Sequence, residues 1–227
     1  MPDPVFQRIA LYHVPDGPLG NFGADWLGWD ARSGTVRESA TPDHWTSRAR
    51  RYGFHATLKA PFRLADGATL AQAAALSEAL SQTLRPATIG DLEPRWLGRF
   101  LALVPVQPTN AIRDLAAQCV RALEPCRAAL SPAEAEKYAA RDLPPELQAN
   151  VNRWGYPHVM DAFRFHLTLT DRLPKADRAA AQAALCLPPE RLGYRLSHIS
   201  LMGEDTGGYF HEIARYALAD RPEGSAR

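Results

Sequence analysis

Two short phrases in this 227-residue chain carry the residue types that acid–base chemistry needs. Phe54-His55-Ala56-Thr57-Leu58 and Phe165-His166-Leu167-Thr168-Leu169 share the pattern Phe-His-x-Thr-Leu. Alternate side chains of a β-strand lie on one face, so strands at these positions place each imidazole beside a hydroxyl, with Lys59 on the face of His55 and Thr57. Two such strands could hold a phosphate group between two proton-transfer groups.

Other histidines compete with this pair. His44 begins a His-Trp-Thr phrase, but no strand pattern precedes it, which indicates a loop or a helix. His198 in His-Ile-Ser-Leu is the more serious rival, because it lies on a predicted strand and Ser can replace Thr. A lone strand histidine is usually a structural residue with satisfied hydrogen bonds. Two copies in equivalent positions favour a shared chemical role for His55 and His166.

The pattern of hydrophobic residues predicts two similar halves. The first half has strands at 8–14 and at the first phrase, a helix at 69–84, two antiparallel strands within 87–106 and a helix near 112–123, with short helices near 24–29 and 42–50. The second half has a strand at the second phrase, a helix at 175–186 and strands at 192–202 and 209–218. A capping box at Ser131 to Glu134 and the Pro144-Pro145-Glu146 start predict a pair of connecting helices.

The resulting prediction is one α+β domain over residues 1–227, built from duplicated strand–helix–strand halves around a central groove. Its lobes span about 8–124 and 158–218, and a helical connector spans about 125–157. The final stretch, Arg221 to Arg227, is predicted to be a frayed tail.

Composition narrows the class of protein. Hydrophobic residues make up 46% of the chain and charged residues 22%, which are ordinary values for a globular protein. The formal net charge of +1 provides no electrostatic basis for binding extended nucleic acid. Three cysteines without metal-type spacing favour a reducing compartment, and neither a signal peptide at the N-terminus nor a membrane-length apolar run is evident. We therefore expect a cytoplasmic protein without membrane association.

The paired His-x-Thr phrases resemble those of the two-histidine (2H) phosphoesterase superfamily. The longer phrases, Arg51 to Phe62 and Gly155 to His166, resemble a narrower branch associated with bacterial phosphonate-degradation gene clusters. The resemblance runs from about Arg8 to Leu218. It implies a bilobal α+β duplication in which one motif from each lobe lines a central groove. His158 departs from the aromatic residue expected after Pro157.

Carried over to this chain, the resemblance makes His55 the acid and His166 the base, although the residues themselves do not decide which is which. Thr57 and Thr168 become the phosphate-binding hydroxyls. Four further side chains are substrate-binding candidates, each weighed against a structural role: Tyr12, Lys59, Tyr156 and Arg164.

The predicted function is hydrolysis of a small ribose-derived cyclic phosphate by acid–base catalysis, without a metal or another cofactor. Neither His-x-His nor His-Glu-x-x-His occurs, which makes a zinc site the weaker hypothesis. The branch suggests a phosphoribosyl cyclic phosphate as substrate. The alternatives are an RNA-end 2′,3′-cyclic phosphodiesterase or ligase-like enzyme, and a non-catalytic nucleotide-binding module.

Overall fold

The computed structural model describes residues 6–107 and 109–219, so the tail predicted at 221–227 lies outside the described residues. The largest sheet has the order β11-β10-β1-β4 and is antiparallel throughout. Its strands are β1 (Arg8–His13), β4 (Ala56–Phe62), β10 (His198–Glu204) and β11 (Phe210–Ala217). The α+β prediction is confirmed.

A second antiparallel sheet has the order β6-β7-β8 and contains β6 (Leu92–Leu97), β7 (Phe100–Pro105) and β8 (Leu167–Thr168). Two further pairs join β5 (Ala87–Gly90) to β9 (Tyr194–Leu196), and β2 (Trp29–Asp30) to β3 (Thr35–Val36). Both larger sheets therefore combine strands from the first and the second half of the chain. The lobes predicted at 8–124 and 158–218 are interleaved in space.

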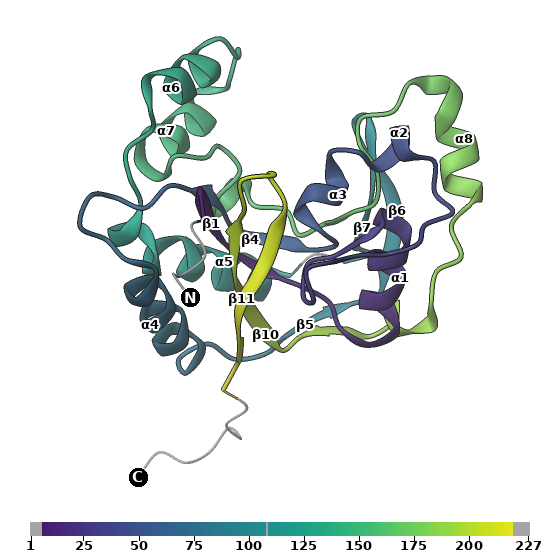
Figure 1. Ribbon diagram of the computed structural model, residues 1–227, viewed down its shortest axis with the longest axis horizontal. Helices are drawn as coiled ribbons and strands as arrows, with labels where there is room; N and C mark the ends of the chain where they lie inside the picture. The colour runs from purple at the N-terminus through teal and green to yellow at the C-terminus, as the bar shows by residue number, and fades with distance from the viewer. Residues whose placement is uncertain (1–5, 108, 220–227) are drawn as a thin grey trace.

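Helices surround these sheets (Figure 1). They are α1 (Gly17–Leu27), α2 (Asp43–Thr46), α3 (Ala49–Tyr52), α4 (Leu70–Ser81), α5 (Asn110–Ala122), α6 (Pro132–Ala139), α7 (Pro145–Trp154) and α8 (Lys175–Ala183). Figure 1 shows α6 and α7 together at one end of the molecule, with α2 and α8 at the other end. Capping boxes begin α4 and α6, as Thr69 with Gln72 and Ser131 with Glu134.

The apolar residues of both motifs belong to the main hydrophobic core. Phe54, Leu58, Phe165, Leu167 and Leu169 are all buried there. This burial confirms the predicted alternation, in which apolar side chains point inward while the intervening His and Thr side chains remain half-buried.

Three details differ from the prediction. The region 87–106 holds three strands rather than two, because Gly90 ends β5 with a positive φ of 79° and β5 then pairs with the distant β9. The first helix begins at Gly17 instead of near residue 24. The second motif forms a strand only at Leu167–Thr168, so His166 lies immediately before it.

Irregular pairing between β1 and β4 decides which side chains share a face. Tyr12 pairs with Thr57, whereas its neighbour Leu11 pairs with Lys59, so one extra residue bulges from β4 between the two pairs. Paired residues lie on the same face of a sheet. Thr57 therefore shares a face with Tyr12, and Lys59 shares the opposite face with Leu11.

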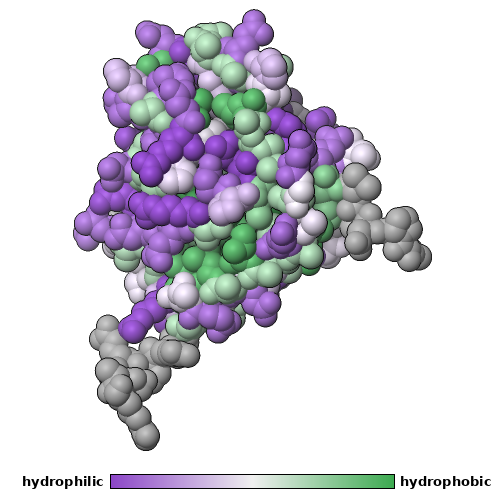
Figure 2. Space-filling model, turned by 90° about the vertical axis from the view of Figure 1, so that its left-hand side faces the viewer, coloured by the Kyte–Doolittle hydropathy of each residue, from purple (hydrophilic) through white to green (hydrophobic). Residues whose placement is uncertain are grey.

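The surface beside α6 and α7 mixes hydrophilic residues with small hydrophobic patches (Figure 2). Within residues 6–107 and 109–219, no helix combines the length and the apolar character that crossing a bilayer requires.

Candidate active site

The two motifs meet at a pocket with a volume of about 300 Å³. His55 and Thr57 reach it from the start of β4, and Thr168 reaches it from β8. β4 and β8 are the terminal strands of their sheets. The pocket thus lies where an edge of one sheet approaches an edge of the other.

Both motif histidines are held by the same local bond. Nδ1 of His55 lies 2.9 Å from the carbonyl oxygen of Gly53, and Nδ1 of His166 lies 2.8 Å from that of Arg164. A carbonyl oxygen only accepts hydrogen bonds, so each Nδ1 carries the proton and donates it. In the neutral form of each imidazole, Nε2 then holds the lone pair that can accept a proton.

Gly53 makes the bond to His55 possible. Its φ of 72° is in the left-handed region, which glycine adopts without steric cost. A Cβ atom built on this residue would lie 2.6 Å from the Cβ atom of Ala31. The tight turn before β4 therefore requires glycine for two independent reasons.

Nε2 of His55 lies 3.0 Å from Oγ1 of Thr57, which confirms that these two side chains share a face. The ring of His55 also stacks on Tyr12, with centroids 3.8 Å apart and planes inclined by 20°. Tyr12 is fully buried and lines the pocket. The imidazole is thus fixed by a carbonyl, a hydroxyl and an aromatic face.

Burial lowers the pKa of both histidines. The pKa of His55 falls to about 4, chiefly because desolvation disfavours the imidazolium; the bond to Gly53 opposes this effect, and the charge of His166 adds to it. Desolvation also lowers the pKa of His166, with the bond to Arg164 opposing it and the charge of His158 adding to it. Unlike His55, Thr57 and Thr168, the His166 side chain is not among the residues that line the pocket.

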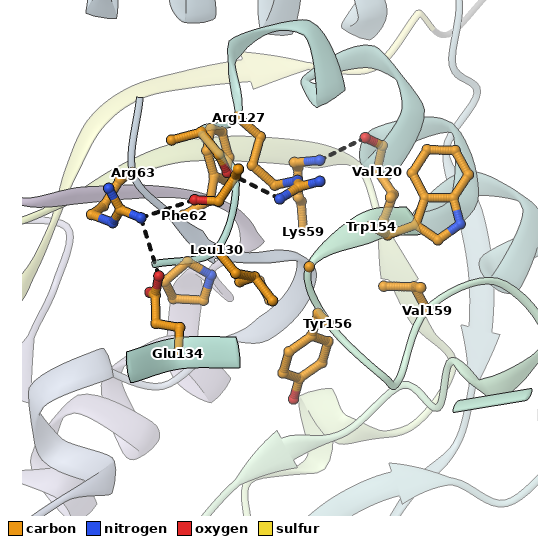
Figure 3. Close-up of a pocket in the computed structure, with 15 residues that line it drawn as sticks. Lys59, Phe62, Arg63, Val120, Arg127, Leu130, Glu134, Trp154, Tyr156 and Val159 are labelled. Atoms are coloured by element: carbon orange, nitrogen blue, oxygen red, sulfur yellow. Dashed lines mark hydrogen bonds and ion pairs between the residues drawn. The ribbon is translucent and has the colours of Figure 1, made fainter. Parts of the chain in front are cut away.

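Lys59 does not line this pocket, and it does not share the face of Thr57, contrary to the prediction. Its ammonium group bonds to the carbonyl oxygen of Val120 at 2.8 Å (Figure 3). It also bonds to the carboxylate of Glu124 at 2.9 Å. The bulge in β4 is the physical reason, because it moves Lys59 to the face opposite Thr57.

Arg164 does not line the histidine pocket either. Its side chain is exposed and its residue lines a different cavity, near Phe163 and Phe165. Its contribution to the site is the main-chain oxygen that holds His166. Tyr156 does line the histidine pocket, and its hydroxyl points away from the cluster of Lys59 and Arg127 in Figure 3.

Three pocket residues with polar side chains were not predicted from the sequence: Arg8, Tyr52 and Tyr138. Arg8 and Tyr12 occupy alternate positions of β1, so strand parity could have identified Arg8 once Tyr12 was a candidate. Tyr52 lies within the longer phrase around the first motif. Tyr138 comes from α6 in the connector, and no local pattern indicates that this helix reaches the pocket.

His198 has a structural role instead of a place in the pocket. Its Nε2 donates to the carbonyl oxygen of Val14 at 2.8 Å, and its own carbonyl accepts from Nδ1 of His13 at 3.0 Å. Nε2 of His13 then accepts from the hydroxyl of Tyr194 at 2.6 Å. Burial lowers the pKa of both His13 and His198, so this pair is neutral and fully bonded. His44 is exposed and lies 3.6 Å from Asp177.

Metal-binding side chains do not gather in the part of the chain that the structure describes. Within residues 6–107 and 109–219, no group of three or more His, Cys, Asp or Glu side chains is arranged to hold a metal ion.

Comparison with known proteins identifies longer relatives. The chain is 37% identical over 180 residues to a ribose 1,5-bisphosphate phosphokinase PhnN of Janthinobacterium sp. (strain Marseille), covering 75% of this chain and 40% of the relative. It is 38% identical over 211 residues to the protein of the same name from Laribacter hongkongensis (strain HLHK9), covering 82% of this chain and 47% of the relative. The chain thus spans less than half the length of these curated relatives.

Solved structures give weaker similarities. A crystal structure of a phosphoesterase is 20% identical with a TM-score of 0.45, covering 94% of this chain and 99% of its own. E. coli LigT complexed with 3′-AMP is 17% identical with a TM-score of 0.43, covering 95% of this chain and 100% of its own.

A family model also matches the chain. The model described as "Protein of unknown function (DUF1045)" matches residues 57–211, which include Thr57, His166 and Thr168. The matched region begins just after His55 and covers more than half of the chain. The chain therefore belongs to the DUF1045 family.

Proposed function

We propose that the protein hydrolyses a small ribose-derived cyclic phosphodiester with His55 and His166 as a paired acid and base, without a metal ion. The observation that carries this proposal is the equivalent placement of the two histidines. Each is fixed through Nδ1 by the carbonyl oxygen two residues before it, and each is followed two residues later by a threonine of the same pocket.

The proposed reaction needs one neutral and one protonated imidazole. The neutral Nε2 takes a proton from water while the water oxygen forms a bond to phosphorus. The protonated Nε2 donates its proton to the sugar oxygen as the bond from that oxygen to phosphorus breaks. One water molecule is consumed, and the ring opens to a phosphate monoester and a free hydroxyl.

Thr57 and Thr168 supply the electrostatic part of this mechanism. Their hydroxyls would donate hydrogen bonds to the non-bridging phosphate oxygens, on which negative charge grows in the transition state. Both threonines line the pocket, and Thr57 already contacts Nε2 of His55. This arrangement supports the roles that the family resemblance implies for them.

The pocket supports a small substrate. Its volume of about 300 Å³ is at the lower end for ligand sites, and the net charge of +1 does not favour a long polyanion. The curated relatives are named for a ribose bisphosphate, which is also a phosphorylated sugar. A phosphoribosyl cyclic phosphate, as the resemblance suggests, fits these constraints.

The second candidate function is hydrolysis at an RNA end. The observation in its favour is the number of aromatic rings that line the pocket, namely those of Tyr12, Tyr52, Tyr138 and Tyr156, because exposed rings can stack on a nucleobase. Tyr12 is fully buried and already stacked on His55, which reduces the surface available for stacking. A binding module without catalysis would leave the matched pair of proton-transfer groups unused.

A panel of cyclic phosphates tests the proposal. Purified protein treated with EDTA would be incubated with ribose cyclic phosphates, nucleoside 2′,3′-cyclic phosphates and an oligonucleotide with a cyclic phosphate end, and the products followed by ³¹P NMR. We expect ring opening of a small ribose cyclic phosphate in the presence of EDTA. Loss of turnover that zinc or manganese restores would contradict the mechanism, and preference for the oligonucleotide would favour the second candidate.

A further inference from the structure

Among the described residues that line the histidine pocket, Arg8 is the one that carries a permanent charge. We infer that Arg8 forms a second anion-binding subsite there, so that the substrate carries a phosphate group besides the one that is hydrolysed. This inference rests on the proposed function and adds a specificity-determining residue to it.

The geometry of Arg8 leaves donors for a ligand. Its Nε and Nη2 atoms bond to the two carboxylate oxygens of Glu204 at 2.5 and 2.6 Å. A guanidinium has five N–H donors arranged in a planar fork, so one edge can hold a carboxylate while the other holds a phosphate. The side chain of Arg8 is 31% exposed, whereas that of Glu204 is 9% exposed. The carboxylate fixes the orientation of the guanidinium, and part of the arginine remains open to the pocket.

Tyrosines line the pocket together with this guanidinium. The pKa of Arg8 is raised, chiefly by its bond to Glu204 and to a smaller extent by Tyr52. The charge of Arg8 in turn acts to lower the pKa of Tyr12 and of Tyr138, although burial raises both. All three tyrosines line the same pocket. A guanidinium that shares a pocket with phenolic hydroxyls is part of a set of hydrogen-bond donors, which suits a phosphate group.

The hydroxyl of Tyr12 gives a second, independent indication that a ligand supplies a hydrogen-bond acceptor in this pocket. Tyr12 is fully buried, and among the described residues its hydroxyl has no hydrogen-bond partner. A buried polar group without a partner costs about 1–3 kcal/mol. An acceptor bound near Arg8 would remove that cost.

Position along the strand connects the two subsites. Arg8 and Tyr12 lie four residues apart on one face of β1, which is about 13 Å along a strand, and Tyr12 stacks on His55. The length of the arginine side chain can shorten that separation. Arg8, Tyr12 and His55 line one pocket of about 300 Å³, so a single small sugar phosphate could place its reacting phosphate at the histidines and its other phosphate at Arg8.

A purely structural role for Arg8 makes a different prediction. Arg8 and Glu204 are paired across β1 and β10, so their ion pair also ties the sheet together. If this tie were its whole role, changing Arg8 would alter stability but would affect phosphorylated and unphosphorylated substrates equally.

Kinetics with two matched substrates separate these roles. The two substrates are ribose 1,2-cyclic phosphate with and without a 5-phosphate. For the wild type and for Arg8→Lys, kcat/KM would be measured on both substrates, and the value with the 5-phosphate would be divided by the value without it. Lysine keeps a cation beside Glu204 but has no second edge for an anion. We expect the ratio to fall at least about 10-fold in Arg8→Lys, consistent with the loss of a charge-assisted hydrogen bond. The exposed Arg121→Lys serves as the matched control and should leave the ratio unchanged.

A binding experiment keeps this inference separate from the proposed function. Ribose 5-phosphate would be titrated into the wild type and into Arg8→Lys by calorimetry, since this probe has one phosphate and no cyclic ester. We expect affinity at least about 10-fold weaker for Arg8→Lys. If Arg8→Lys fails to fold, the double variant Arg8→Gln/Glu204→Gln removes both charges and takes its place.

The outcomes are distinct. An unchanged ratio together with unchanged affinity for ribose 5-phosphate would overturn the second subsite while leaving the hydrolase proposal intact. Failure of the wild type to turn over either cyclic phosphate would instead contradict the proposed function, and the calorimetric comparison would still decide the role of Arg8.

Discussion

His55 and His166 are held in the same tautomer by equivalent hydrogen bonds, each donated from Nδ1 to the carbonyl oxygen two residues earlier. The two residues immediately precede strands that belong to different sheets and differ in length. The bond therefore does not depend on shared strand geometry. It leaves Nε2 of both side chains in the chemical state that proton transfer requires.

Gly53→Ala tests how the first histidine is positioned. The added methyl group meets the Cβ atom of Ala31, and alanine disfavours the positive φ, so we expect the turn before β4 to shift. The free energy of unfolding should fall by about 1–3 kcal/mol, and kcat should fall further than in the matched variant Gly67→Ala, whose Cβ meets no atom within 4 Å. If Gly53→Ala and Gly67→Ala lowered stability in urea denaturation equally and also lowered kcat equally, Gly53 would have no special role in positioning His55.

The network around His198 yields a prediction about stability. His198→Ala leaves the carbonyl oxygen of Val14 without its donor, which should cost about 1–3 kcal/mol in the free energy of unfolding. The exposed His44→Ala should change it little. Turnover per folded molecule should be retained in both variants. A loss of kcat in His198→Ala as large as that in His166→Ala would bring the His-x-Ser phrase back into the site.

Much of the fold follows from local patterns. The capping boxes at Thr69 and Ser131 mark the starts of two helices, and the alternation in both motifs identifies the buried side chains. Local patterns do not predict which strands pair in each sheet. The pairing of β1 with β10 and of β7 with β8 joins residues far apart in the chain. Such pairing is decided by packing of the whole core and not by any local sequence.

In the site, too, some features follow from local sequence and others do not. Strand parity predicts that Thr57 lies beside His55, and the distance of 3.0 Å agrees. The same parity fails at Lys59, because the position of the bulge depends on how β4 pairs with the distant strand β1. Tyr138 reaches the pocket through the connector, which the sequence identified as helical without indicating where it packs.

The dependence of rate on pH follows from burial. Because desolvation lowers the pKa of His55 and His166 in the free protein, the form with one proton on the pair is most populated below their ordinary pKa of about 6.5. The bell of kcat/KM should therefore have its alkaline limb below pH ~6.5. A bound phosphate anion stabilises the imidazolium, so the limb of kcat should lie at higher pH. A rate that rises to a plateau would indicate a single base.

The threonines provide a graded test of phosphate binding. Thr57→Val and Thr168→Val remove one hydroxyl each while nearly keeping side-chain volume, and each should lower kcat by roughly 10-fold, as expected for one lost hydrogen bond. Thr35→Val, an exposed threonine far from both motifs in sequence, serves as the control. Steady-state kinetics check the expectation, and wild-type rates in both variants would exclude the hydroxyls from the transition state.

The most direct test of the paired-histidine account is the turnover number of His55→Ala, His166→Ala and the double variant on the best cyclic phosphate of the panel. Each single change should lower kcat by roughly 10²-fold to 10⁴-fold, and the double variant should be little worse than the worse single variant, because acid and base act as one unit. Circular dichroism would confirm that the variants are folded. Wild-type turnover in either single variant, or losses that multiply in the double variant, would contradict the account.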